Sequence, residues 1–233
     1  MKFHIRLIPL VATILLCVLG IVLGQWQSRR AIDKERTKEL IAAQANLPPV
    51  ALDAVNVKEM PFRKVALQGE FVSDWPIYLD NRSLHGVAGF YVLMPFRLKE
   101  SGIHIMVARG WLPRNPNNRL ELPKLVTPSG QIHLIGRVRE SLDRVLQLGK
   151  QAELSPSMIV QNLDIESIRK KTQLKFEDFF VEQISEEPDN LRRDWSQAGN
   201  GSEKNRAYAF QWYALSVMAF IFFVVTGFRR GKN

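Results

Sequence analysis

The sequence predicts an α+β membrane protein in which two transmembrane helices flank one mainly antiparallel, outward-facing β domain with small helices. Three observations predict it. An uncharged apolar run lies near each end of the 233-residue chain. Between the two runs, short apolar segments are separated by turn-forming residues, which is typical of strands in an antiparallel sheet. Five of the nine net positive charges lie in residues 1–28 and 207–233, beside the apolar runs.

The first transmembrane helix is predicted over residues 7–25. Leu7 to Gly24 reads LIPLVATILLCVLGIVLG, 18 residues without a charge. At about 1.5 Å per residue, such a helix crosses most of a hydrocarbon layer of roughly 30 Å. Gln25 and Trp26 then mark the membrane boundary. A cleaved signal peptide is the alternative, but the apolar run is longer than the usual h-region and lacks an Ala-x-Ala ending.

The outward domain is predicted over residues 26–206. It begins with a charged helical stretch over residues 28–45, and the turn chemistry of residues 80–83 separates two of its strands. A short helix is predicted over residues 165–172, with Asp164 as its N-cap. The predicted strands are residues 63–71, 76–79, 89–98, 104–111, 131–139 and 179–184.

The second transmembrane helix is predicted over residues 207–228, a run of 22 residues in which Gln211 is the one strongly polar side chain. Aromatic residues mark its outer boundary and basic residues its inner boundary, as in many membrane helices. These flanking residues are Tyr208, Trp212 and Tyr213 at the start, and Arg229 and Arg230 at the end.

The flanking charges predict that both termini, residues 1–6 and 229–233, are cytoplasmic. The basic residues that follow the first span, Arg29 and Arg30 among them, argue for the opposite orientation. However, the roughly 180 residues between the spans far exceed the short loops for which this charge rule decides. The central domain is therefore expected in the periplasm. A bacterial inner membrane is expected because no Arg-rich, acid-poor presequence precedes the first span.

The composition excludes several classes of function. The net charge of +9 is shared between the two flanks and a large domain, so a nucleic acid is not an expected partner. A single Cys and four His leave little from which to build a metal site. No nucleophile elbow or phosphate-binding Gly loop is present in the sequence, which predicts a protein that is not an enzyme. An envelope hydrolase that uses Asp80, Asp164 and Glu182 is the enzymatic alternative, although carboxylates at unrelated spacing are nearly always surface charges.

Two groups of residues are candidates for binding. Asn205, Tyr208 and Trp212 are three and then four positions apart, so they share one face of the second helix. That face is either an ordinary aromatic belt or a surface that binds a flat hydrophobic cofactor or a partner's helix. Arg109, which precedes Gly110 and Trp111, either binds an anionic group or flanks a Trp that closes the β core. His85, His104 and His133 could ligate haem iron, but an isolated His is more often structural.

Four segments, in this order, resemble the surfeit locus family of cytochrome c oxidase assembly factors. The resemblance extends over nearly the whole chain, and its pieces lie at the matching ends of the two spans. The segments are LGQWQ from Leu23, DNR from Asp80, RGWLP from Arg109 and YAFQWY from Tyr208.

The resemblance implies a role in oxidase assembly: haem a insertion into the catalytic subunit of a haem-copper oxidase, or stabilisation of that subunit. The lipid bilayer and haem a synthase are further candidate partners. In some bacterial members a His seven positions before the Trp that matches Trp212 is implicated in holding the haem iron, and here Asn205, a poor iron ligand, stands at that position. Transient haem a would contact Trp212, Tyr208 and Arg206, with Arg109 on a propionate. The alternative is a cofactor-free two-span scaffold that stabilises a respiratory-complex subunit by protein contacts.

Overall fold

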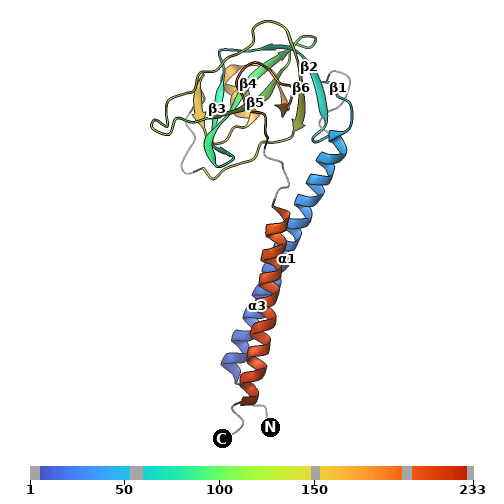
Figure 1. Cartoon of the computed structure of the whole chain (residues 1–233), viewed down its shortest axis with the longest axis vertical. Helices are drawn as coiled ribbons and strands as arrows, with labels where there is room; N and C mark the ends of the chain where they lie inside the picture. Colours follow the sequence, from blue (N-terminus) through green and yellow to red (C-terminus); the bar gives the residue numbers. More distant parts are fainter. Residues whose placement is uncertain (1–5, 53–59, 148–152, 196–200, 230–233) are drawn as a thin grey trace. The chain divides into compact units, whose positions relative to one another are not determined.

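The computed structural model describes residues 6–52, 60–147, 153–195 and 201–229. The chain divides into two compact units, which Figure 1 shows as a pair of long helices and a β domain. The helix pair belongs to residues 1–40 and 197–233, and the β domain to residues 41–196. Most of the two predicted cytoplasmic ends lies outside the described residues.

The helix pair consists of α1 (Leu7–Ala45, 39 residues) and α3 (Ser202–Arg229, 28 residues). Both contain a stretch long and apolar enough to span a membrane. The predicted first span and the predicted charged stretch form one continuous helix, because the residues that join them are mostly strong helix formers. The helix ends shortly before Pro48, which cannot continue it. At about 1.5 Å per residue α1 is longer than a bilayer is thick, so its charged part extends beyond the hydrocarbon layer.

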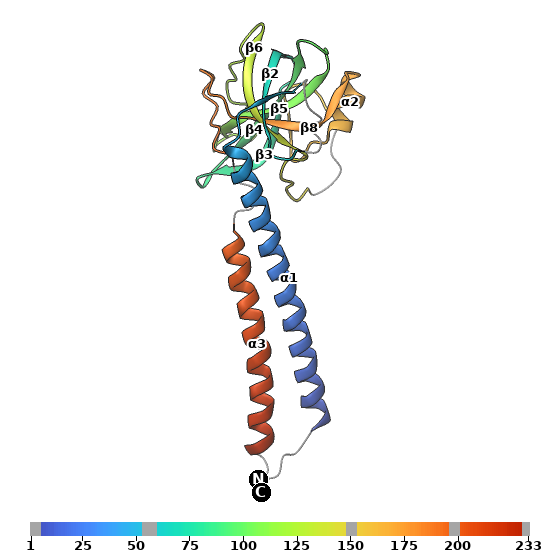
Figure 2. The same ribbon diagram turned by 90° about the vertical axis from the view of Figure 1, so that its right-hand side faces the viewer.

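The helices α1 and α3 run antiparallel and pack closely against each other, as Figures 1 and 2 show from two directions. A Cβ atom added to Gly20 would lie 2.1 Å from Ser216 Oγ, and one added to Gly24 would lie 2.5 Å from the Tyr213 ring. Cys17 Sγ donates a hydrogen bond to the Ser216 carbonyl oxygen at 3.3 Å. Small residues at the contact thus allow the two backbones to approach, as is common between membrane helices.

The β domain contains an eight-stranded sheet in the order β1-β2-β6-β8-β5-β4-β3-β7, with an additional pairing between β2 and β4. This pairing closes β2, β6, β8, β5 and β4 into a barrel-like ring. Most neighbours are antiparallel, which confirms the predicted class, and the parallel pairs are β1–β2, β3–β7 and β5–β8. The elements are β1 (Val50–Ala51), β2 (Lys64–Phe71), β3 (Ile77–Leu84), β4 (Val87–Leu98), β5 (His104–Pro113), β6 (Ile132–Arg139), β7 (Met158–Val160), α2 (Ile165–Thr172) and β8 (Phe176–Gln183).

The predicted turn at residues 80–83 is wrong. Strand β3 continues to Leu84, and the chain reverses at His85 and Gly86, whose φ angles are 50° and 81°. Residues 80–81 instead form an irregularity in the register between β3 and β4, where Asn81 has a φ of 61°. Asn tolerates this left-handed conformation, so the turn-forming composition produced a bulge within a strand.

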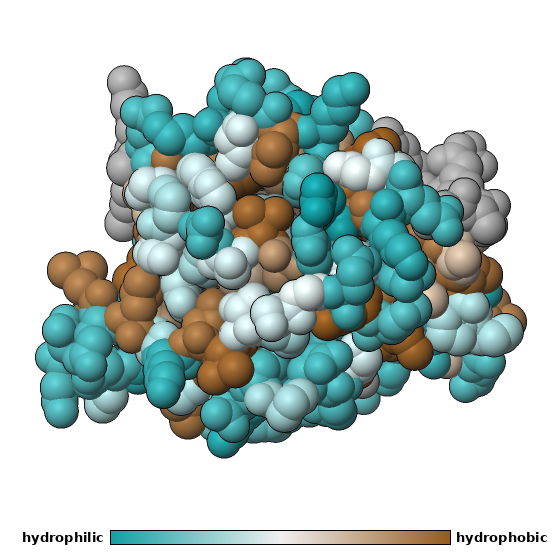
Figure 3. Space-filling model, turned by 90° about the horizontal axis from the view of Figure 1, so that it is seen from above, coloured by the Kyte–Doolittle hydropathy of each residue, from teal (hydrophilic) through white to brown (hydrophobic). Residues whose placement is uncertain are grey.

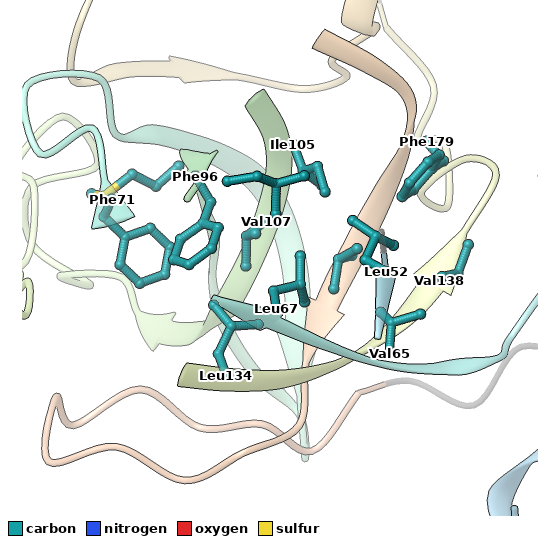
Figure 4. Close-up of a cluster of buried hydrophobic side chains, with 13 residues drawn as sticks. Leu52, Val65, Leu67, Phe71, Phe96, Ile105, Val107, Leu134, Val138 and Phe179 are labelled. Atoms are coloured by element: carbon teal, nitrogen blue, oxygen red, sulfur yellow. The ribbon is translucent and has the colours of Figure 1, made fainter. Parts of the chain in front are cut away.

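The main core lies inside the ring and consists of apolar side chains from β2, β4, β5, β6 and β8 together with Leu52 (Figure 4). A second cluster packs α2 and β7 against the other side of the sheet. The predicted cap of α2 is confirmed, because Asp164 Oδ1 accepts a hydrogen bond from the Ser167 backbone N–H at 2.7 Å. On the face seen in Figure 3, polar and apolar residues are interspersed over the surface of the molecule.

Candidate functional site

Asn205, in the first turns of α3, forms a polar bridge to α1. Its Oδ1 accepts a hydrogen bond from Lys34 Nζ at 2.8 Å, and its Nδ2 donates to Gln27 Oε1 at 2.6 Å. Gln27 and Lys34 are seven positions apart, so they lie on one face of α1 two turns from each other. Both functions of the Asn205 amide are therefore used in holding the two helices together.

Tyr208 and Trp212 continue the face of α3 on which Asn205 lies, since the chain is helical across all three positions. The Tyr208 side chain is exposed, whereas Trp212 is half-buried beside an open apolar groove of about 360 Å³ between the two helices. We refer to this side of the helix pair as the groove flank. The groove is lined by Leu16, Leu19, Gly20, Trp212, Leu215, Met218, Ala219 and Phe222.

Arg206 lies on the opposite side of the helix pair. It donates from Nη2 to Glu35 Oε2 at 2.6 Å. One residue along a helix turns the side chain by about 100°, so Arg206 is directed away from the face of Tyr208 and Trp212. The family resemblance predicts that these residues form one contact site for haem a, and the structure separates Arg206 from the other three.

Arg30 is an exposed cation that α1 places on the groove flank, and it is not among the site residues predicted from the sequence. Leu16, Leu19, Leu23, Trp26 and Arg30 follow one another at steps of three and four residues, so they form one stripe along α1. The first two of them line the groove. The Arg30 guanidinium carbon lies 5.4 Å from the centre of the Trp26 ring, within the range of a cation–π contact. The spacing from the leucines was the signal in the sequence that could have identified it.

Arg109 lies in the core of the β domain, and its side chain is 0% exposed. It donates hydrogen bonds to Thr127 Oγ1 at 2.8 Å, to the Val126 carbonyl oxygen at 2.9 Å and to Asp189 Oδ2 at 3.1 Å. Its guanidinium carbon also lies 4.6 Å from the centre of the Phe71 ring. Burial lowers the pKa of Arg109, and the Asp189 carboxylate partly counteracts this effect. The guanidinium therefore does not reach the surface of its domain.

Gly110 and Trp111 contact the same segment as Arg109 does, residues 189–192. A Cβ atom added to Gly110 would lie 2.7 Å from Leu191 Cβ. Trp111 and Arg192 exchange backbone hydrogen bonds of 2.7 and 3.0 Å. The segment 109–111 thus anchors residues 189–192 to the sheet, and its geometry favours the structural interpretation of the Trp over anion binding.

The remaining candidate residues have structural partners in the β domain. Asp80 pairs with Arg114 at 3.2 Å, and Glu182 accepts hydrogen bonds from Arg137 and Arg139. His104 is buried, with Nδ1 3.3 Å from the Lys175 carbonyl oxygen. Among the residues that the structure describes, no group of three or more His, Cys, Asp or Glu side chains could hold a metal ion. His85 and His133 are exposed.

Comparison with known proteins extends over both units. A model of the SURF1 family matches residues 14–217. The SURF1-like protein of Rickettsia felis is 28% identical over 217 residues, which cover 88% of this chain and 90% of that protein. The SURF1-like protein of Rickettsia bellii is 29% identical over 211 residues, 85% of this chain and 82% of that protein. The cytochrome oxidase assembly protein SHY1 of Saccharomyces cerevisiae is 29% identical over 101 residues, 41% of this chain and 25% of that protein. Because the family match includes most of α1, the whole β domain and about half of α3, this chain belongs to the SURF1 family.

Proposed function

We propose that this protein is an assembly factor for a haem-copper cytochrome c oxidase and that it acts without catalysing a reaction. The observation that carries the proposal is the family match over residues 14–217, together with a relative that is named a cytochrome oxidase assembly protein. The partner is the catalytic oxidase subunit, and haem a synthase is a second candidate. The protein lies in a bacterial inner membrane, with the β domain in the periplasm and both termini in the cytoplasm.

The helix pair is the part that we propose to contact the oxidase subunit within the membrane. The small residues of α1, including Gly20 and Gly24, already pack against α3. Contacts with a partner must therefore use the outward-facing apolar side chains. Phe210 and Phe220 of α3 are 73% and 58% exposed and are available for such contacts.

The groove flank fits haem a only in part. A haem a carrier needs an apolar wall for the ring, cations for the propionates and a ligand for the iron. Trp212 and Tyr208 supply the wall, and Arg30 supplies a cation. Position 205 supplies no iron ligand, because an Asn amide stands there and both of its functions are engaged with α1. Arg206 faces Glu35. These residues support transient contact with haem a at most, and they favour stabilisation of the oxidase subunit through protein contacts.

Deletion of the gene tests the assembly role. We expect membranes of the deletion strain to contain less assembled oxidase, measured by the haem a bands of the reduced-minus-oxidised spectrum. The native chain should restore these bands. An undiminished oxidase content in the deletion strain would contradict the proposal.

A visible spectrum of the purified protein tests the part played by haem a. The native chain and Asn205→His are purified in detergent from cells that synthesise haem a. We expect the native chain to retain little haem a, and Asn205→His to retain more because imidazole is a good iron ligand. Stoichiometric haem a on the native chain would show that another residue ligates the iron, and would favour haem delivery over protein contacts.

A further inference from the structure

The groove flank has the dimensions of a site for a single lipid chain. Its groove of about 360 Å³ is lined by apolar side chains of both helices. At about 30 Å³ for a water-sized group, this volume holds on the order of a dozen such groups. A helix is roughly 10 Å wide with its side chains and would not fit. The groove therefore suits one unbranched apolar chain.

The cation on this flank lies at the height where the headgroup of such a lipid would be. Arg30 follows Leu19 by 11 positions and Leu16 by 14, so it lies about 16–21 Å along the axis from the groove-lining leucines. Half of the hydrocarbon layer is about 15 Å thick. A chain that fills the groove would thus bring its headgroup to the level of Arg30.

The charges at this boundary are unbalanced. Arg29, Arg30 and Arg36 are exposed, and within the described parts of the chain none of them forms an ion pair with a carboxylate. Residues 28–45 contain five basic side chains against three acidic ones, Asp33, Glu35 and Glu39, and Glu35 is already paired with Arg206. Unpaired arginines beside a membrane attract anionic lipids. Arg30 is the one of the three that lies on the stripe of the groove-lining residues, and its guanidinium contacts the Trp26 ring of the same stripe.

We propose that the groove flank binds one anionic phospholipid, with an acyl chain in the groove and the phosphate beside Arg30. Arginine suits this role because its planar guanidinium donates two parallel hydrogen bonds to a phosphate. Trp212 forms part of the groove wall and therefore reports on the chain. The site requires neither haem a nor an oxidase, so it can be tested on protein made in cells that lack both.

The test is quenching of tryptophan fluorescence by brominated lipids. The full chain is reconstituted into phosphatidylcholine nanodiscs that contain a small, equal fraction of either brominated phosphatidylglycerol or brominated phosphatidylcholine. We expect the phosphatidylglycerol to quench more strongly. Trp212→Phe should lose the part of the additional quenching that arises in the groove, while Trp26 beside Arg30 still reports on lipid near the headgroup. Arg30→Gln should reduce the preference for phosphatidylglycerol about fivefold, the effect of one arginine at a membrane surface.

Two matched controls separate a bound lipid from general attraction. Arg36→Gln removes the same charge about 9 Å further along the helix and should largely keep the preference. Ala219→Phe fills the groove and should abolish the preferential quenching, whereas Val217→Phe, on the other side of α3, should not. Circular dichroism confirms that each variant keeps its helices. Equal quenching by the two lipids, or a preference that survives Arg30→Gln or Ala219→Phe, would overturn the proposal.

Discussion

The helix pair and the β domain bring buried polar groups together in different ways. Between α1 and α3, small side chains allow close approach, and the polar contacts include the partly buried Asn205 amide and one largely exposed ion pair, Arg206 with Glu35. The β domain instead buries complete ion pairs, with Arg109 and Arg193 on Asp189. Helices in lipid gain little from burying apolar surface, so they depend on close packing. The domain core gains much from it and can offset the desolvation of charges.

The two units differ in the state of the polar groups that remain after one partner is substituted. Removal of one member of a buried ion cluster leaves the opposite charges without compensation in a medium of low dielectric constant. Removal of one neutral contact between membrane helices leaves groups that find other partners. We therefore expect large losses of stability in the β domain and small losses in the helix pair.

The largest effect is expected for Asp189→Leu. This substitution leaves Arg109, whose side chain is 0% exposed, without its carboxylate partner. Arg193, whose side chain is 2% exposed, keeps the longer contact with the exposed Glu186 at 3.6 Å. We expect the free energy of unfolding of the β domain to fall by about 3–5 kcal/mol. Urea unfolding of the detergent-solubilised chain, followed by near-ultraviolet circular dichroism, measures it. Glu70→Gln removes one member of the more exposed pair with Arg97 and should cost less than about 1 kcal/mol. Similar losses in the two variants would contradict the comparison.

A smaller effect is expected when the contact between the helices is overfilled. In Gly20→Leu, the added side chain meets Ser216 Oγ and the Trp212 carbonyl oxygen. We expect the helix pair to lose about 1–3 kcal/mol, as overpacked cores do. Titration with SDS in mixed micelles measures the loss. Val18→Leu enlarges an exposed residue of the same helix and serves as the control. If both variants unfold at the same SDS fraction, α1 and α3 do not pack at Gly20.

The bridge made by Asn205 should contribute less still. Asn205→Ala removes the hydrogen bonds to Lys34 and Gln27, and polar contacts between membrane helices contribute about 0.6 kcal/mol on average and at most about 1.7. The same SDS titration measures the change, with the exposed Lys204→Ala as the matched control. A loss of several kcal/mol would mean that this bridge stabilises the helix pair as strongly as the ion clusters stabilise the β domain, and would contradict the expected difference between the two units.

Local features of the fold could be read from the sequence because their causes are local. The apolar runs predicted both long helices, and Asp164 predicted the start of α2 through its position before the helical pattern. The continuity of α1 could also have been predicted, since no residue between 25 and 45 breaks a helix. The two short strands β1 and β7 carry too few residues to show a pattern, because pairing with a neighbouring strand defines them.

The candidate site was harder to predict because its geometry depends on distant contacts. The partner of Arg109 is 80 positions further along the chain, and only the fold brings Asp189 to it. The sequence therefore left two interpretations of Arg109 open, an anion site and a neighbour of a Trp that closes the β core. The face shared by Asn205 and Trp212 followed from helical spacing, but the bridge to Lys34 depends on how α1 lies against α3.

The smallest effect is a pH dependence within the β domain. Burial lowers the pKa of His104, and the hydrogen bond to the Lys175 carbonyl oxygen counteracts only part of this effect. The unfolded chain therefore binds the proton first. The contribution of neutral His104 to stability is complete above about pH 6.5, the ordinary pKa of His. It declines as the pH falls from there through the pKa of the folded state, and is constant below it.

A comparison of the native protein with His104→Gln separates the pH-dependent contribution of His104 from that of the other titrating groups. Urea midpoints between pH 8 and pH 5 should fall more steeply for the native chain than for the variant, which has no imidazole at this position. Parallel profiles for the native chain and His104→Gln would show that the β domain accepts a proton at position 104 as readily as the unfolded chain does. In the arginine cluster, a specific carboxylate offsets the charge of Arg109, whereas His104 has no such partner among its described contacts. Parallel profiles would therefore mean that the β domain can bury a charge even without a paired carboxylate.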